Sequence, residues 1–327
     1  DYSQASGGVW VNLNTSGAQD TKSAGSDTLS EIENIRGSSY DDRLWGDDHN
    51  NTLEARDGND IIDGRGGDDV LNGGDGDDRL IGGDGDDWII PGDDAQRGND
   101  TIEGGAGSDT VDYSTAKARV IVNLETGTTR DGSGRDTLSS IENIIGSDYL
   151  DTFGRLGDKL NGSNADNYID GRGADDDING YGGNDHLLGG SGYDRISGGD
   201  GDDRIEGGSG PDDLWGDGGD DLIIGGSGVN YMDGGDGNDR IVSQSDGDTG
   251  VGGNHNDIFF LYGSGSYNGD HGDDLFVMRD LGSGNLNGGI GIDTVSYAER
   301  DMPIRADLNT TVTTYINGFG DDFLTLS

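Results

Sequence analysis

A nine-residue pattern repeats along most of this chain and restricts its fold more than any other feature. The clearest copies are Gly73–Ile81 and Gly82–Ile90, which read GGDGDDRLI and GGDGDDWII. Six units follow one another without slippage from Gly37 to Ile90, and eleven more run from Gly162 to Phe260. Because short units of fixed length bury their apolar face only by stacking on their neighbours, the pattern predicts a solenoid.

Position eight of the units is apolar with one exception, Gly250, whereas position seven mixes Arg, Thr and Tyr. This alternation is typical of a short strand with one inward side chain. We expect three residues of each unit to form the strand and the other six to turn the chain. The predicted core residues are Leu44, Leu53, Ile62, Leu71, Leu80, Ile89, Ile169, Ile178, Leu187, Ile196, Ile205, Leu214, Ile223, Met232, Ile241 and Phe259.

Positions one, two and four are mostly glycine, as expected where a tight turn needs positive φ angles and close backbone approach. Position six is aspartate, or asparagine at residues 51, 167 and 230. One carboxylate with several main-chain carbonyls is a hard-oxygen site, which favours Ca²⁺ over zinc or copper. Mg²⁺ is less suitable because it requires near-octahedral coordination and gives up its water ligands reluctantly.

We predict these carboxylate ligands, including positions in degenerate units: Asp42, Asp60, Asp69, Asp78, Asp87, Asp100, Asp109, Asp176, Asp185, Asp194, Asp203, Asp212, Asp221, Asp239, Asp248, Asp257, Asp274 and Asp293. The predicted carbonyl ligands belong to Gly73, Gly74, Asp75, Gly76, Asp77, Gly82, Gly83, Gly85, Gly189, Gly190, Gly192, Gly198, Gly199 and Gly201.

If each unit is half of a coil, unit n stacks on unit n+2, so Asp60 lies near Asp78 and Asp69 near Asp87. Neighbouring strands are about 4.8 Å apart, so acidic columns form on both sides and repel one another unless cations intervene. The expected core of Ile and Leu is too thin to fold such a roll alone. Metal binding should therefore supply folding free energy, with roughly one ion for each well-formed unit.

Composition agrees with a metal-dependent fold. The chain has 327 residues with 66 glycines, 66 acidic residues, no cysteine and a formal net charge of -46. Such a polyanion is not expected to bind nucleic acid or anionic lipid. No apolar stretch approaches the roughly 20 residues of a membrane helix, and no signal peptide is visible. Without disulfides, another source of extracellular stability is required.

The pattern Gly-Gly-x-Gly-x-Asp-x-apolar-x resembles the RTX, or hemolysin-type calcium-binding, repeat over roughly two thirds of the chain. The resemblance implies an all-β fold, a right-handed parallel β-roll with several Ca²⁺ ions in paired turns. It also implies type I secretion through an uncleaved C-terminal signal, and folding only after export. Extracellular calcium modules bind at about 10⁻⁴ to 10⁻³ M.

A longer motif interrupts the repeats. It opens at residues 1, 112 and 296, continues as alternating strands at 9–13, 120–124 and 304–308, and in two copies closes as Asp27–Ile35 and Asp136–Ile144. We interpret it as a β-rich cap, with ligand binding or self-assembly as the alternative. The expected domains are a capping segment at 1–36, a roll at 37–112, a second capping segment at 113–145, a second roll at 146–295 and a third, truncated capping segment at 296–327. The chain is expected to be part of a longer protein.

Enzyme motifs are absent from the sequence. His49, His186, His255 and His271 head no His-Glu-x-x-His motif, and no Gly-x-Ser-x-Gly elbow occurs. The periodic carboxylates are explained by calcium and therefore do not indicate a glycosidase. We expect no catalytic residue and no enzymatic activity.

Outward aromatic residues such as Trp45, Trp88 and Trp215 could stack on sugar rings, although scattered surface aromatics are common. Position nine lacks the regular Thr or Asn rank that ice binding would need. The aromatic stretch from Phe259 to Met278 fits a cap, a bend or an interface equally well.

These features favour a calcium-binding structural segment of a large secreted or cell-surface protein of adhesin, surface-layer or matrix type. One alternative is the C-terminal secretion and folding module of an exported protease, lipase or polysaccharide-modifying enzyme. Another is a carbohydrate-binding module. The expected partners are calcium and either further copies of the chain or surface glycans, without nucleic acid or membrane insertion.

Overall fold

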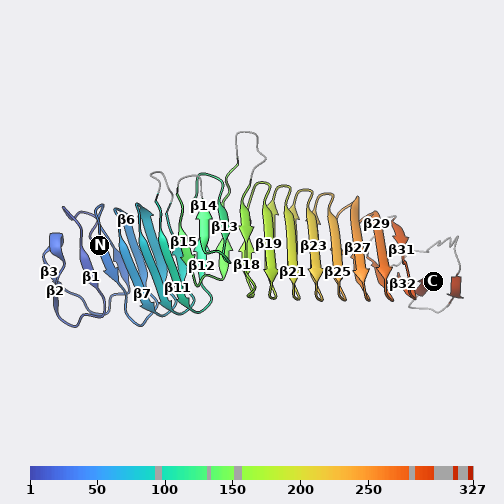
Figure 1. The fold of residues 1–327 in the computed structure, drawn as a ribbon, viewed down its shortest axis with the longest axis horizontal. Coiled ribbons are helices and arrows are strands. Elements are labelled where there is room, and N and C mark those ends of the chain that lie inside the picture. The colour runs from blue at the N-terminus through green and yellow to red at the C-terminus, as the bar shows by residue number, and fades with distance from the viewer. Residues whose placement is uncertain are drawn as a thin grey trace. The chain divides into compact units, whose positions relative to one another are not determined.

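The chain forms a parallel β-solenoid, as the repeats predict (Figure 1). The computed structural model describes residues 1–92, 98–130, 134–150, 157–279 and 284–297, and the backbone of strands at 312–315 and 323–326. Within these ranges the only helix is a 3-10 turn, η1 (Lys22–Ala24). The chain divides into two compact units, Asp1–Ser163 (unit 1) and Asn164–Ser327 (unit 2), and each is described by itself.

Unit 1 contains two sheets and a hairpin. One sheet has the spatial order β1 (Trp10–Asn12), β5 (Arg43–Trp45), β7 (Ile61–Gly66), β9 (Arg79–Asp84), β11 (Thr101–Ala106), β15 (Thr137–Ser139), β14 (Thr128–Arg130), β13 (Ile121–Asn123) and β17 (Lys159–Asn161). The other has the order β4 (Asn34–Arg36), β6 (Thr52–Asp57), β8 (Val70–Asp75), β10 (Trp88–Ile90), β12 (Thr110–Asp112) and β16 (Asn143–Ile145). The hairpin pairs β2 (Ala18–Asp20) with β3 (Ser26–Thr28).

Unit 2 repeats this architecture. Its first sheet has the order β19 (Asp177–Gly182), β21 (Arg195–Asp200), β23 (Asp213–Gly218), β25 (Tyr231–Asp236), β27 (Asp248–Asn254), β29 (Gly265–His271) and β31 (Asn285–Asn287). Its second has β18 (Tyr168–Asp170), β20 (His186–Ser191), β22 (Arg204–Ser209), β24 (Leu222–Ser227), β26 (Arg240–Ser243), β28 (Ile258–Leu261), β30 (Leu275–Met278), β32 (Asp293–Ser296), β34 (Phe323–Leu326) and β33 (Val312–Tyr315).

The strand register confirms that each unit stacks on the next but one. Ile62 of β7 pairs with Leu80 of β9 and with Leu44 of β5, all at position eight. The predicted strand length is wrong, since most strands in the arrays have six residues rather than three. Pairing continues past the first glycine, for example between Arg65 and Gly83, so only the middle of the unit turns.

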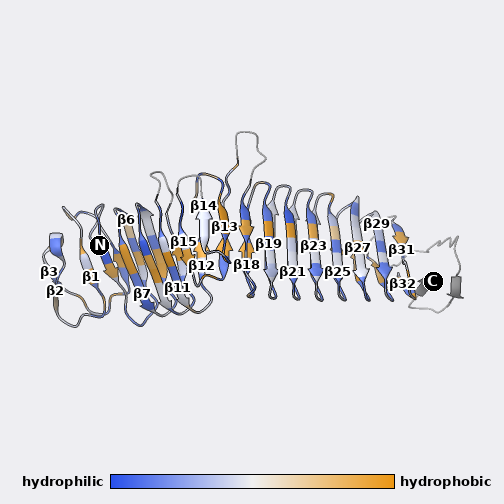
Figure 2. Cartoon of the chain, in the orientation of Figure 1, coloured by the Kyte–Doolittle hydropathy of each residue, from blue (hydrophilic) through white to orange (hydrophobic). Residues whose placement is uncertain are grey.

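The core consists of the position-eight side chains, and a hydrophobic band crosses the strands of the rolls (Figure 2). Every apolar residue predicted at this position is buried, with at most 1% of its surface exposed. Positions seven and nine face outward, as in Arg79-Leu80-Ile81, where only Leu80 is buried. The prediction of one inward residue per unit is therefore confirmed.

The aromatic stretch after residue 258 extends this core. Phe259 stacks on Phe276 with ring centroids 4.7 Å apart, and Tyr267 is 2% exposed. Gly250 leaves the space that these rings need: a Cβ there would lie 2.9 Å from Tyr267 Cδ1 and 3.2 Å from Phe259 Cε1. The one gap in the apolar column is therefore filled from the next coil.

Strands of the first two longer motifs join the sheets of unit 1, since β1 pairs with β5 and β13 with β17. The third copy, including the predicted strand at 304–308, lies largely outside the described residues. The domain boundaries proposed from the sequence remain a prediction.

Candidate metal centre

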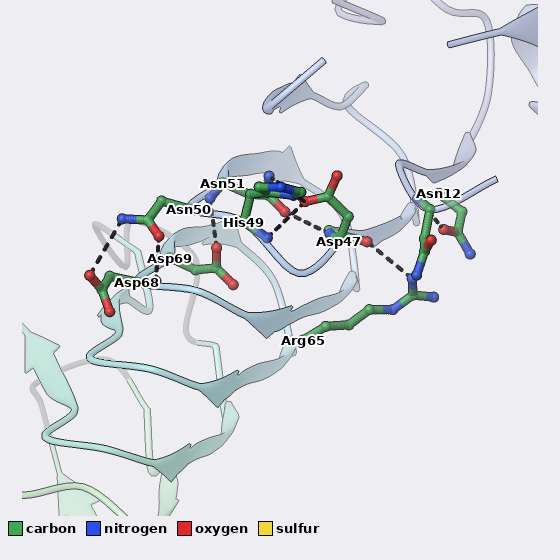
Figure 3. Close-up of polar contacts among 10 residues, drawn as sticks. Asn12, Asp47, His49, Asn50, Asn51, Arg65, Asp68 and Asp69 are labelled. Atoms are coloured by element: carbon green, nitrogen blue, oxygen red, sulfur yellow. Dashed lines mark hydrogen bonds and ion pairs between the residues drawn. The ribbon is translucent and has the colours of Figure 1, made fainter. Parts of the chain in front are cut away.

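The position-six aspartates form hydrogen-bonded columns along the turns. The Asp42 amide donates to Asp60 Oδ1 at 2.6 Å, and the Asp60 amide donates to Asp78 Oδ1 at 2.7 Å. On the opposite side the Asn51 amide donates to Asp69 Oδ1 at 2.6 Å (Figure 3). Each buried carboxylate thus uses one oxygen to secure the preceding coil.

The second oxygen of most of these carboxylates has no hydrogen-bond partner within the described part of the chain. The affected Oδ2 atoms, all buried, belong to Asp60, Asp69, Asp78, Asp87, Asp109, Asp185, Asp194, Asp203, Asp212, Asp221, Asp239, Asp257 and Asp274. A buried carboxylate oxygen without a donor costs several kcal/mol, so its regular recurrence indicates a partner of positive charge.

A main-chain carbonyl of the next coil lies near many of these oxygens. Asp69 Oδ2 lies beside Gly64, where a Cβ would overlap it and would also lie 2.7 Å from the Gly82 carbonyl oxygen. The carbonyl oxygens of Gly58 and Gly76 each lie close to a glycine of the following coil. A side chain in place of that glycine would clash with the oxygen. Gly76 itself has a φ of 140°, which explains glycine at position four.

The predicted carbonyl ligands are not equivalent. The carbonyl oxygens of Gly82, Gly189 and Gly198 lie near the position-one glycine of the preceding coil. An Asp Oδ2 atom lies near the same glycine. Those of Gly74, Gly83, Gly190, Gly192 and others face the following coil. The Asp75 carbonyl, in contrast, accepts a hydrogen bond from the Gly58 amide at 2.9 Å.

Burial raises the pKa of the column carboxyls. It raises the pKa of Asp60, Asp221 and Asp257 to about 8, with a smaller contribution from neighbouring carboxylates, while the backbone hydrogen bond opposes the shift. The same cause raises the pKa of Asp78 and Asp194 to about 7. Without a cation, these sites therefore favour the protonated form near neutral pH.

Asp42 and Asp248 differ from the column members whose Oδ2 atoms lack a donor. Asp42 accepts from the Ser38 amide through Oδ2 and from the Val9 amide and Ser38 hydroxyl through Oδ1. Asp248 Oδ2 accepts from the Ser243 hydroxyl at 2.6 Å. Protein donors occupy the oxygens that are free elsewhere, so these aspartates fit column ends better than ion sites.

The sequence did not single out two further carboxylates of the column. Asp158 repeats the Asp42 arrangement, with the Ser147 amide on Oδ2 and the Val120 amide on Oδ1. Asp136 Oδ2 accepts from the hydroxyls of Tyr113 and Thr129 at 2.8 and 2.9 Å. Asp136 begins the closing sequence of the second longer motif, which was its available signal, whereas Asp158 lies after that motif.

A second ladder at position five was also missed. The Asp68 amide donates to Asn50 Oδ1 at 2.9 Å (Figure 3), and the Asp86 amide donates to Asp68 Oδ1 at 3.1 Å. These bonds run in the opposite direction to those at position six. The frequent Asp and Asn residues at position five were its visible signal.

His49 and His186 make their contacts outside the position-six columns. His49 is exposed and contacts Asp47, while His186 lies between Tyr168 and Glu206 on the outer face. Within the described ranges no three His, Cys, Asp or Glu side chains converge as a metal cluster. Most coil turns instead offer one carboxylate oxygen near main-chain carbonyls. This all-oxygen donor set, with a recurrent uncompensated charge, fits Ca²⁺.

The match to a protein-family model agrees with this chemistry. The family model of the RTX calcium-binding nonapeptide repeat (4 copies) matches residues 27–62, 63–95, 94–114, 154–187, 179–214, 206–241 and 215–250, which together exceed half of the chain. The chain is also similar to the crystal structure of a hyperactive, Ca²⁺-dependent, β-helical antifreeze protein from an Antarctic bacterium. That match has 19% identity and a TM-score of 0.49, and covers 82% of this chain and 85% of the other. No curated protein matches significantly. No helix in the described ranges is long and apolar enough to cross a membrane.

Proposed function

Because this chain belongs to the family of RTX calcium-binding nonapeptide repeat proteins, we propose that it is a calcium-stabilised structural segment of a large exported surface protein. The parent would be of adhesin, surface-layer or matrix type. It would leave the cell unfolded, by the type I route that the family implies, and fold where calcium is abundant.

The row of buried Asp Oδ2 atoms without hydrogen-bond donors carries this proposal. In it, position-six carboxylates and the carbonyls of positions one, two and four bind Ca²⁺. The ion supplies the positive charge that compensates the buried carboxylates. The Oδ1 atoms meanwhile keep consecutive coils in register through their backbone amide bonds.

The proposed ligands are the predicted carboxylates, with two exceptions. Asp42 and Asp248 are left out because Ser38 and Ser243 already donate to their Oδ2 atoms. Asp100, Asp176 and Asp293 remain because they occupy the same position in the repeat. In Asp100 and Asp293, Oδ1 also accepts a hydrogen bond from a backbone amide of the preceding coil.

Counting bound ions tests the calcium sites directly. Equilibrium dialysis against about 1 mM Ca²⁺, near the affinity of extracellular modules, should give on the order of ten ions per chain. A count near zero in a folded protein would overturn the proposal. The parent's full reading frame tests the structural role, because a catalytic domain in the same polypeptide would favour the secretion-module alternative.

A further inference from the structure

The first capping segment, residues 1–36, resembles the second, residues 113–145, in sequence and internal contacts. The second segment pairs with the last coil of the roll that precedes it. The closing sequences are nearly identical, DTLSEIENI at Asp27–Ile35 and DTLSSIENI at Asp136–Ile144. Their internal contacts also agree. The Tyr2 hydroxyl donates to Oδ2 of Asp27, and the Tyr113 hydroxyl donates to Oδ2 of Asp136.

In the second capping segment, both strand edges receive the coil that ends the preceding roll. Strand β15 pairs in parallel with β11, and β16 pairs in parallel with β12. The Asp100 amide donates to Asp136 Oδ1 at 3.0 Å, and the Asp109 amide donates to Glu142 Oε2 at 2.9 Å. The two carboxylates therefore continue the hydrogen-bonded columns of the roll.

In the first capping segment, the same edges lack a partner among the described residues. Strand β4 ends its sheet, and β3 pairs only with β2. The Glu33 carbonyl accepts from the Thr52 amide on one side, so the Asn34 amide of the same planar peptide points to the other, open side. The equivalent Asn143 amide donates to the Asp109 carbonyl at 2.9 Å.

Side-chain burial follows the same division. Ile141 is 7% exposed at the occupied joint, whereas its counterpart Ile32 is 41% exposed. Leu138 is buried, whereas its counterpart Leu29 is only partly covered. Leu29 and Ile32 line a surface hollow, so apolar surface lies beside two unpaired strand edges.

We propose that β3, β4, Leu29 and Ile32 form a docking face for the closing coil of another nonapeptide roll, joined in line ahead of Asp1. Two strands of one coil would add in parallel to β3 and β4. Two position-six amides would donate to Asp27 and to the Glu33 carboxylate. These contacts suit an acid-rich partner, because the partner offers backbone N–H groups to the carboxylates rather than charged side chains.

A graft with single-cysteine labelling tests this face, because the chain contains no cysteine. A copy of residues 37–111 is placed ahead of Asp1, so that Val111 precedes Asp1 as it precedes Asp112. Maleimide labelling in calcium is compared for Ile32→Cys in the grafted and original chains. Ile141→Cys serves as the buried reference, and Val229→Cys, at a residue 59% exposed, as the exposed control.

We expect the graft to slow labelling of Ile32→Cys about 10-fold or more, toward the rate of Ile141→Cys, because docking must open before the thiol reacts. Val229→Cys should react equally fast in both chains. A graft carrying Ile102→Asp and Val111→Asp should leave Ile32→Cys fast. Equal labelling of Ile32→Cys with and without the unaltered graft would overturn the proposal.

Discussion

The backbone amide of Asp60 donates to Oδ1 of Asp78 at 2.7 Å, while Oδ2 of Asp78 is buried without a hydrogen-bond donor in the described structure. One carboxylate thus serves two purposes. Its first oxygen sets the register between coils, and its second leaves a negative charge that the protein alone does not compensate. The calcium proposal follows from this division, which recurs along both units.

Asp203 allows the two purposes to be separated. Asp203→Asn keeps an acceptor for the Asp185 amide, as Asn230 accepts from the Asp212 amide at 3.0 Å, but it removes the charge. We expect the number of bound Ca²⁺ ions to fall by about one while the fold persists, because stacked repeats share stability. Equilibrium dialysis measures the count. Asp202→Asn, in the adjacent exposed position, should retain every ion, and an unchanged count in Asp203→Asn would contradict the ligand assignment.

Asp203→Ala removes both functions. We expect it to lose the same ion and a further 1–3 kcal/mol or so of unfolding free energy relative to Asp203→Asn, because the buried Asp185 amide loses its acceptor. Urea unfolding in saturating calcium gives the difference. Equal stability of the two variants would show that the Oδ1 bond contributes little.

Glycine at position four is tested by Gly201→Ala. Gly201 has a φ of 133°, and a Cβ there would overlap the Gly183 carbonyl. We expect a loss of more than about 1 kcal/mol in unfolding free energy. Gly218→Ala is the control, because the nearest atom to its Cβ would be 3.8 Å away. Similar losses in both variants would refute the steric explanation.

The apolar column is tested at Leu80, which is fully buried. Leu80→Ala should cost about 2–5 kcal/mol of unfolding free energy in saturating calcium, through lost burial and a cavity. Arg79→Ala, at the neighbouring exposed position, should cost less than about 1 kcal/mol, since Arg79 forms a solvent-exposed ion pair with Glu103. The two denaturation curves decide the matter, and equal costs would mean that position eight does not form the core.

Stability should depend on pH in opposite directions with and without calcium. Burial raises the pKa of Asp60 and Asp221 from 3.8 to about 8, so their folded forms favour protonation. Their stabilisation of the metal-free fold is complete below about pH 4 and is lost as pH rises through about 8. After exhaustive dialysis into metal-free buffer, circular dichroism should therefore show more β-structure at pH 5 than at pH 8.

Calcium affinity should instead increase over the same range, because the ligands must be deprotonated. Titrations at pH 5.5 and 7.5 should give a lower calcium midpoint at the higher pH. A midpoint independent of pH would exclude the raised-pKa carboxyls as ligands.

The repeats predicted the inward column and the stacking of alternate units because both depend only on spacing within the nine-residue unit. Leu80 and Asp78 have counterparts in similar surroundings in most coils. Asp42 could not be distinguished from Asp60 in this way, since its Oδ2 donor comes from Ser38 and an Oδ1 donor from Val9, 33 residues earlier. The exception at Gly250 likewise depends on Tyr267, in the next coil of the same sheet. Contacts that differ from one repeat to another can be identified only in the folded structure.

Far-UV circular dichroism of the metal-free protein at neutral pH, titrated with Ca²⁺ and separately with Mg²⁺, tests the central claim most directly. The account predicts a cooperative transition from coil to β-structure with Ca²⁺ and none at matched Mg²⁺, because the buried Oδ2 atoms need a large cation with flexible oxygen coordination. A spectrum already rich in β-structure without metal, and unchanged by calcium, would contradict it.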